Sequence, residues 1–489
     1  MARRLVKRVA LLLAVIALTR LGVRIYDSQR GPELESWHTY RPHELKGKQL
    51  AELDWAGYRK AEDALFDEVR SEVTQKLDPD QRVPVNRYFE GSPVYPGNFS
   101  PDWNRSYVLE PDGIPVGAVV LLHGLTDAPY SLRHIARRYR ELGYVAVAIR
   151  LPGHGTVPGS LADVEWEDWS AATRLAVREA RRRAGPSTPL HLVGYSTGGA
   201  LALQYALDAI GDAKLARPDR IVLLSPMIGI TRFARFAGLL GLPAFFPAFA
   251  KAAWLSVLPE FNPFKYNSFP VNAALQSSLL ARSLQQQLTR HTRDDLLVGL
   301  PPILTFQSVV DFTVSTPAIV SALYAQLPAN GSELVLFDIN RNAKLGLLLR
   351  SGADTALDGL LPEAPRRFRT AIVANASPNS SEVVARVIEA NTVTEQSRAL
   401  GLVYPSDVFS LSHVAVPFPM SDGVYGMEPD PSEHFGVNLG AMAARGERGT
   451  LIVSLDFVSR TASNPFFPYM LERIESGIGT MHDVTHDFR

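Results

Sequence analysis

The chain has 489 residues, of which 46% are hydrophobic and 20% charged, so it can bury a sizeable core and its composition argues against global disorder. Lys and Arg number 50, and so do Asp and Glu. This balance gives no electrostatic reason to expect nucleic acid or another polyanion as a partner. The sequence contains no cysteine, which excludes disulfides, thiolate metal sites and a cysteine nucleophile.

The first 26 residues have the pattern of a targeting segment. Basic side chains between positions 3 and 8 precede the apolar run Val9–Leu18, as in a secretory signal. No small-x-small cleavage site follows, and the run is shorter than the roughly 20 residues that span a bilayer comfortably. We expect residues 1–26 to be an uncleaved signal-anchor or a cleaved signal peptide, with an interfacial or buried helix as the third interpretation. The first two place the body outside the cytoplasm, membrane-anchored or secreted (on the periplasmic side in a bacterium).

Residues 27–85 are polar and carry apolar side chains at helical spacing, most clearly from Tyr58 to Leu77. We expect a helical connector there, with one helix that packs on the body. Residues 86–489 are expected to form the body. The first part of the body contains several prolines, so we expect it to form at most one or two edge strands.

From Val116 onward, short apolar runs alternate with helical patterns at 131–142 and 168–184. Runs of this kind are typical of strands buried on both faces. The alternation predicts an α/β fold, with a mostly parallel sheet covered by helices on both faces. Active sites of such sheets lie beyond the carboxyl ends of the strands. The predicted strands are 116–122, 144–149, 190–193, 220–225 and 302–307.

Two insertions interrupt the alternation. Residues 226–300 are rich in aromatic and small side chains, and we expect their prolines to break them into short helices. Two interpretations stay open, a helical subdomain with its own core or a lid lined for an apolar substrate. The second insertion covers about 340–400, with a strand expected at 368–374 and a helix at 382–390.

The segment Gly194-Tyr195-Ser196-Thr197-Gly198 stands between the strand 190–193 and a run of helix formers. Strand, glycine-flanked serine and helix are the context of a nucleophile elbow, whose tight turn lifts the hydroxyl to a helix N-terminus. The alternative is a strand-to-helix turn with a capping serine. Ser196 is the candidate nucleophile.

A serine nucleophile needs a base, an acid that orients the base, and donors for the oxyanion. Asp311 follows the strand 302–307 and is the candidate acid, with Asp338 as the runner-up because it also ends an apolar strand. His413 is the candidate base because it lies in a loop, from which a side chain is easily aimed across the sheet. The other downstream histidines lie in polar segments and are His434, His482 and His486.

The pair His123-Gly124 directly follows the strand 116–122. In this architecture the backbone N–H after such a pair points at the nascent oxyanion, and the second donor is the N–H after the nucleophile. Leu125 and Thr197 are therefore the candidate oxyanion donors. The His123 side chain is expected to brace the loop.

Together with Pro152-Gly153-His154-Gly155, these motifs resemble the α/β-hydrolase superfamily. Within it, the set is most similar to the monoacylglycerol lipase, lysophospholipase and serine aminopeptidase-like group. The chain order of serine, acid and histidine is the order of that fold. The separation of Asp311 from His413, about 100 residues, is longer than these relatives usually show.

The resemblance implies a serine hydrolase that cleaves a carboxylic ester, an acyl or lipid ester, through an acyl-enzyme. It implies no cofactor and no metal, a small-molecule acyl ester as the binding partner, and the N-terminal segment as the contact with a membrane. The same triad serves an acyltransferase or a serine peptidase. A peptidase also needs a carboxylate for a free amino terminus, and Glu165, Glu167 and Asp168 are present. From another class, a catalytically silent, membrane-tethered binding protein of this fold stays open.

Overall fold

The computed structural model describes residues 31–229, 247–311, 313–344, 355–441 and 463–486, and scattered positions between 4 and 26. Most of the expected signal-anchor or signal peptide therefore lies outside the described residues, as do parts of both insertions. Within the described ranges, no helix is both long enough and apolar enough to cross a bilayer.

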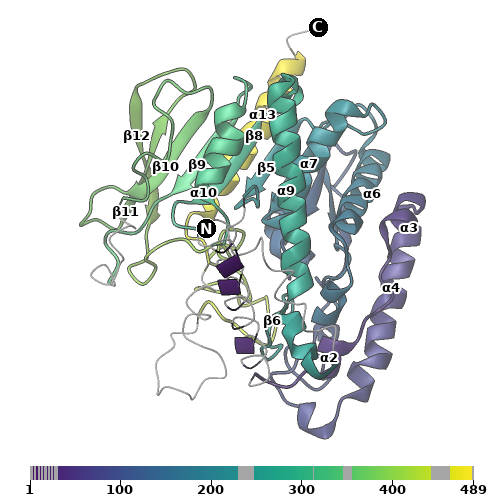
Figure 1. The fold of residues 1–489 in the computed structure, drawn as a ribbon. Helices are drawn as coiled ribbons and strands as arrows, with labels where there is room; N and C mark the ends of the chain where they lie inside the picture. Colours follow the sequence, from purple (N-terminus) through teal and green to yellow (C-terminus); the bar gives the residue numbers. More distant parts are fainter. Residues whose placement is uncertain are drawn as a thin grey trace.

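A ten-stranded sheet runs through the molecule (Figure 1). Its strands are β1 (Tyr107–Leu109), β2 (Gly117–Leu122), β3 (Tyr144–Ile149), β4 (Leu190–Tyr195), β5 (Arg220–Leu224), β8 (Ile303–Ser308), β9 (Glu333–Phe337), β10 (Arg369–Asn375), β11 (Glu382–Ile388) and β12 (Glu395–Val403). Their order across the sheet is β1-β3-β2-β4-β5-β8-β9-β10-β11-β12. From β3 to β10 neighbouring strands are parallel, whereas β1 at one edge and β11 and β12 at the other pair antiparallel.

Helices cover both faces of this sheet, which confirms the expected fold class. On β2, Val119 and Leu121 belong to the core under α5 and α13, while Val120 and Leu122 belong to the core under α6, α7 and α9. Successive strand residues point to opposite faces, so one apolar strand serves both cores. Figure 1 shows α6, α7 and α9 beside one another on the same face. The helices are α2 (Ser36–Thr39), α3 (Gly47–Glu52), α4 (Trp55–Glu72), α5 (Arg133–Glu141), α6 (Trp166–Ala184), α7 (Thr197–Gly211), α9 (Val271–Arg293), α10 (Thr316–Ala318) and α13 (Phe467–His486).

The segment before the sheet is attached to the body through a buried ion pair. The Glu44 carboxylate accepts hydrogen bonds from the Arg150 guanidinium at 2.8 and 3.0 Å, from the Gly153 N–H at 2.9 Å and from the Ser160 hydroxyl at 3.0 Å. The side chains of Glu44 and Arg150 are only 5% and 3% exposed. On the other side, Arg150 lies 3.2 Å from Glu62 of α4. The N-terminal segment therefore holds the loop that follows β3.

Changing Glu44 to Gln is expected to destabilise the folded protein by about 3 kcal/mol, because it leaves a buried guanidinium with half of its neutralising charge. The free energy of unfolding in urea measures the loss. Glu72→Gln is the matched control, since the Glu72 pair with Lys76 is exposed and should contribute less than about 0.5 kcal/mol. Equal small losses in the two variants would contradict a structural role for the Glu44 pair.

The first insertion contains one long helix where short helices were expected. Residues Val271–Arg293 form the 23-residue α9, because no proline follows Pro270 until the helix has ended. Leu280, Leu284 and Leu288 recur at helical spacing and are buried in the core with α6 and α7. The other described elements of this insertion are the 3₁₀ helices Pro247–Ala253 and Leu296–Gly299 and the paired short strands β6 (Trp254–Ser256) and β7 (Phe269–Pro270).

In the second insertion, the strand expected at 368–374 is confirmed as β10, but the helix expected at 382–390 is wrong. Residues Glu382–Ile388 form β11. Val383, Ala385 and Val387 are buried and alternate with more exposed neighbours, a period of two that only a strand can turn to one face. β10, β11 and β12 extend the central sheet beyond β9.

Candidate active site

Ser196 lies on a sharp turn between β4 and α7. Its φ of 53° and ψ of −114° are unusual for a residue other than glycine. A Cβ on Gly194 would lie 2.4 Å from the Gly198 carbonyl oxygen, and a Cβ on Gly198 would lie 1.9 Å from the Leu122 carbonyl oxygen. Only glycine fits at these two positions, which explains the local pattern of small residues around the serine.

His413 connects Ser196 to Asp311. The distance from His413 Nε2 to Ser196 Oγ is 3.0 Å, and the distance from His413 Nδ1 to Asp311 Oδ2 is 2.9 Å. An ionised carboxylate only accepts hydrogen bonds, so we assign the imidazole proton to Nδ1, and Nε2 then accepts from the serine hydroxyl. The structure brings together the three side chains that the sequence singles out, on the carboxyl-end side of the sheet.

Asp311 and His413 are 102 residues apart in the chain. Between them, the chain leads away from the end of β9 and then back to it. The chain leaves the end of β9 at Asn340, runs through β10, β11 and β12, and comes back beside the same residue. The Asn340 N–H donates to the Phe409 carbonyl at 2.8 Å, and the Asn340 side-chain amide donates to the Val408 carbonyl at 2.9 Å. The long gap therefore leaves the geometry of acid and base unaffected.

The Asp311 carboxylate is buried and heavily hydrogen-bonded. Its Oδ1 accepts from the N–H groups of Thr313 at 2.8 Å and Val314 at 3.0 Å, and its Oδ2 accepts from the Gln307 amide at 3.2 Å. Burial alone would raise the pKa of this carboxyl. The interaction with His413 and the backbone hydrogen bonds outweigh burial, so the pKa of Asp311 lies below its usual value. Gln307 lies within β8, where no sequence pattern distinguishes it from other strand residues.

The runner-up residues lie elsewhere. The Asp338 carboxylate at the end of β9 pairs with Arg341, three residues away, and makes no contact with His413. His434 is exposed. His482 and His486 fall in the last turns of α13, where the side chains lie outside the described residues.

The loop of the candidate oxyanion donors begins directly after β2. The N–H groups of Leu125 and Thr197 donate no hydrogen bond to any residue in the described ranges. Thr126 has a φ of 62°, which is rare for a β-branched residue and fits a loop held in place by its surroundings. Its carbonyl accepts a hydrogen bond from the Tyr266 N–H at 2.8 Å. Among the described residues, these two backbone donors near Ser196 are thus left without an acceptor.

The His123 ring braces this loop, as expected. Its Nε2 accepts from the Leu151 N–H at 3.0 Å, and its Nδ1–H donates to the Gly124 carbonyl at 2.8 Å. Burial holds the pKa of His123 well below its usual value, and burial likewise lowers the pKa of neighbouring His154 to about 3. Both imidazoles are therefore neutral and structural.

A cavity of about 380 Å³ opens beside Ser196. The first insertion lines one wall, including the aromatic side chains Tyr266 and Phe269. Two other aromatic residues of the insertion, Phe261 and Phe264, pack in a separate core with Tyr130. Phe233, Phe236, Phe245 and Phe246 lie outside the described residues, as does the side chain of Phe249. The lining residues are Gly124, Leu125, Thr126, Tyr195, Ser196, Thr197, Met227, Asn262, Lys265, Tyr266, Asn267, Phe269, Ala274, Ser277, Thr313, Val314, His413, Val414 and Tyr425.

None of the residues that line this cavity is acidic. The carboxylates considered for a peptidase, Glu165, Glu167 and Asp168, line a separate groove at the start of α6. Asp168 accepts a hydrogen bond there from the Gly47 N–H at 2.7 Å. Across the described part of the chain, no three or more His, Asp or Glu side chains are grouped to hold a metal ion.

Comparison with known proteins agrees with the fold. A sequence model described as "Alpha/beta hydrolase family" matches residues 119–388. A thermostable monoacylglycerol lipase of Bacillus sp. (strain H-257) is 35% identical over 92 residues, which are 19% of this chain and 35% of that protein. A monoacylglycerol lipase of Mycolicibacterium smegmatis is 30% identical over 103 residues, 20% of this chain and 35% of that protein. This chain thus covers about a third of the length of either relative.

Solved structures match a larger share of the chain at lower identity. One, from work on LipS and LipT, two metagenome-derived lipolytic enzymes, has 21% identity and a TM-score of 0.39, and covers 53% of this chain and 97% of that chain. A soluble variant of monoglyceride lipase from Saccharomyces cerevisiae has 16% identity and a TM-score of 0.35, and covers 47% of this chain and 80% of that one.

Proposed function

The chain belongs to the alpha/beta hydrolase family, and from this premise we propose that it is a serine hydrolase that cleaves an acyl ester. Ser196 is the nucleophile, His413 the base and Asp311 the acid that orients it. The observation that carries the proposal is the pair of hydrogen bonds, 3.0 Å and 2.9 Å long, that joins these side chains. The names of the two curated relatives, both monoacylglycerol lipases, support an acyl ester of a lipid as the substrate class.

In the proposed reaction, Ser196 Oγ attacks the ester carbonyl while its proton moves to His413 Nε2. Asp311 stabilises the imidazolium that forms. The N–H groups of Leu125 and Thr197 stabilise the tetrahedral oxyanion, and one such donor is worth about 3 kcal/mol. His413 then protonates the leaving alcohol, and the acyl group stays on Ser196. Water, deprotonated by His413, releases the acid and restores the serine.

The composition of the cavity wall favours an ester over a peptide with a free amino terminus. Binding an ammonium group in a desolvated site needs a carboxylate nearby, and the lining contains a lysine, Lys265, instead. An acyltransferase would use the same three side chains with an alcohol in place of water. The aligned hydrogen bonds between Ser196, His413 and Asp311 favour an enzyme over a catalytically silent binding protein, which does not need them.

The proposal is tested with 4-nitrophenyl esters of increasing acyl chain length. We expect kcat/KM to rise by up to about fourfold per CH₂ from acetate toward octanoate, until the acyl chain fills the cavity. Each buried CH₂ contributes about 0.8 kcal/mol of binding free energy, which corresponds to this factor. Product analysis in the presence of glycerol separates hydrolysis from transfer, because a transferase would yield acylglycerol.

Highest activity on acetate would contradict an apolar acyl site. The absence of turnover by folded protein on every chain length would contradict the hydrolase proposal itself.

A further inference from the structure

Lys265 is the one Lys, Arg, Asp or Glu among the residues that line the cavity beside Ser196. It forms no ion pair with any residue in the described ranges, and it is half-buried. An anion that comes close to a partly buried ammonium at a cavity wall is attracted to it. None of the residues that line the cavity is acidic, so an anionic group on a ligand would meet this lysine without a competing carboxylate in the wall.

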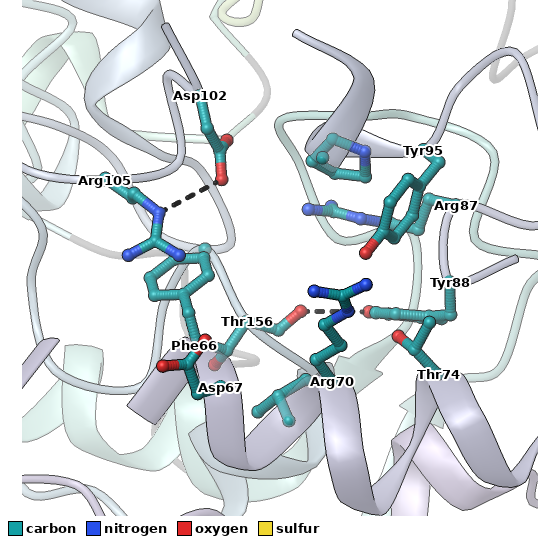
Figure 2. A pocket seen from close by; sticks show the side chains of 14 residues that line it. Phe66, Asp67, Arg70, Thr74, Arg87, Tyr88, Tyr95, Asp102, Arg105 and Thr156 are labelled. Atoms are coloured by element: carbon teal, nitrogen blue, oxygen red, sulfur yellow. Dashed lines mark hydrogen bonds and ion pairs between the residues drawn. The ribbon is translucent and has the colours of Figure 1, made fainter. Parts of the chain in front are cut away.

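Buried Arg87 helps to fix the backbone that carries this lysine. Its guanidinium donates to the carbonyl oxygens of Asn262 at 3.0 Å and Lys265 at 3.3 Å. Figure 2 shows Arg87 and Tyr88 among the residues that line a second cavity of about 190 Å³, where the Tyr88 hydroxyl donates to the Thr156 carbonyl. The oxygens of Asn262, Lys265 and Asn104 that accept from its terminal nitrogens are neutral, and its Nε has no partner among the described residues, so Arg87 adds positive charge behind the wall.

The same segment is tied down on its other side. The Tyr266 N–H donates to the Thr126 carbonyl on the oxyanion loop at 2.8 Å. The buried Glu260 carboxylate accepts from the N–H groups of Asn267 at 3.0 Å and Ser268 at 2.8 Å. Lys265 is therefore carried next to the oxyanion loop on a segment whose backbone cannot move freely.

Asn267 lines the same wall two residues further on. It is 7% exposed, and its Oδ1 accepts no hydrogen bond from the described residues. A buried acceptor without a partner is rare. Because this oxygen has almost no accessible surface, a ligand would reach it only after the Asn267 side chain turned toward the cavity.

Asp127 is the acidic group whose titration responds to Lys265. Burial raises the pKa of its carboxyl to about 6, and the charge of Lys265 partly opposes this rise. Asp127 does not line the cavity, forms no ion pair with Lys265, and accepts from the Ala128 N–H at 3.0 Å. Asp127 therefore offsets part of the Lys265 charge from outside the cavity, and Lys265 is the charged side chain that a ligand in the cavity can contact.

We infer that the ester which binds beside Ser196 carries an acidic group, a carboxylate or a phosphate, that pairs with the Lys265 ammonium. The inference rests on the proposed function and narrows its substrate class. Lysine acts as a compact point charge and accepts either anion without a demanding geometry. The anion takes no part in the acyl transfer, which proceeds at Ser196 as described.

The test compares pairs of esters in which one member carries an anionic group and the other does not. In one arm, 4-nitrophenyl monoesters of adipic to sebacic acid are compared with their methyl-capped forms, which places the anion on the acyl side. In the other arm, 1-acylglycerol 3-phosphate is compared with 1-acylglycerol, which places it on the alcohol side. We expect a lower KM for the anionic form in one arm, and Lys265→Gln should reduce that preference about tenfold, the loss expected for a charged hydrogen bond.

Lys265→Arg should restore most of the preference, because it keeps the charge, and raised salt should weaken it. Lys214→Gln, at an exposed position after α7, is the control that should leave both arms unchanged. Wild-type discrimination against the anion in both arms, or a preference that survives Lys265→Gln, overturns the inference. If the neutral esters are turned over meanwhile, the hydrolase proposal stands; if no ester is cleaved by folded protein, the hydrolase proposal fails.

Discussion

Replacing Ser196 by alanine is expected to lower kcat by about a millionfold on every ester, because no acyl-enzyme can form and the remaining groups only position water. The measurement is kcat on a 4-nitrophenyl ester at saturation. The fold should survive, since alanine is smaller than serine and the serine hydroxyl supports no backbone group in the turn. Matching near-ultraviolet circular dichroism of the two proteins checks this.

Ser225→Ala is the matched control. Ser225 also follows a strand, also has a positive φ of 43°, and its hydroxyl is buried without a hydrogen-bond partner among the described residues. We expect it to keep most of the wild-type kcat. If Ser196→Ala kept more than a tenth of the activity, or if both alanine variants lost activity alike, Ser196 would not be the nucleophile.

Changing Asp311 to Asn is expected to lower kcat by about ten-thousand-fold at neutral pH. The amide has nearly the shape of the carboxylate, but its NH₂ group can donate to His413 Nδ1. That favours the tautomer with its proton on Nε2, which cannot accept from Ser196. Steady-state kinetics between pH 6 and 9 measure the loss. Asp338→Asn is the comparison, and equal losses in the two variants would show that the acid is not Asp311.

The depressed pKa of Asp311 also links this residue to stability. A carboxyl whose pKa is lower in the folded state stabilises the protein above its unfolded pKa of about 3.9, and that stabilisation is lost as the pH falls through the lower folded value. The unfolding free energy of Asp311→Asn should therefore depend less steeply on pH than that of the wild type over this acid range.

The local motifs of the site could be predicted from the sequence because each is forced by sterics or by strand ends. Gly194 and Gly198 have no room for a side chain. The residues that follow the parallel strands β4 and β8 lie at the carboxyl ends of these strands, where active sites of such sheets form. The length of chain between Asp311 and His413 does not by itself predict whether the two side chains meet. The contacts of Asn340 with Val408 and Phe409 reveal that the intervening strands begin and end at one place.

Other features depend on long-range contacts that no local pattern encodes. Val383, Val384 and Val387 are also spaced as on one face of a helix, and pairing with β10 makes this segment a strand. Gln307 and Lys265 become notable only when Asp311 and the oxyanion loop lie beside them. Burial by neighbours, rather than local propensity, decides these outcomes.

The central claim is that Ser196 is an activated nucleophile, and covalent labelling by a fluorophosphonate tests it most directly. We predict that the folded wild-type protein gains the mass of one phosphonyl group, that peptide mapping places it on Ser196, and that Ser196→Ala gains none. An unlabelled folded wild type, or a label that persists in Ser196→Ala, would contradict the account.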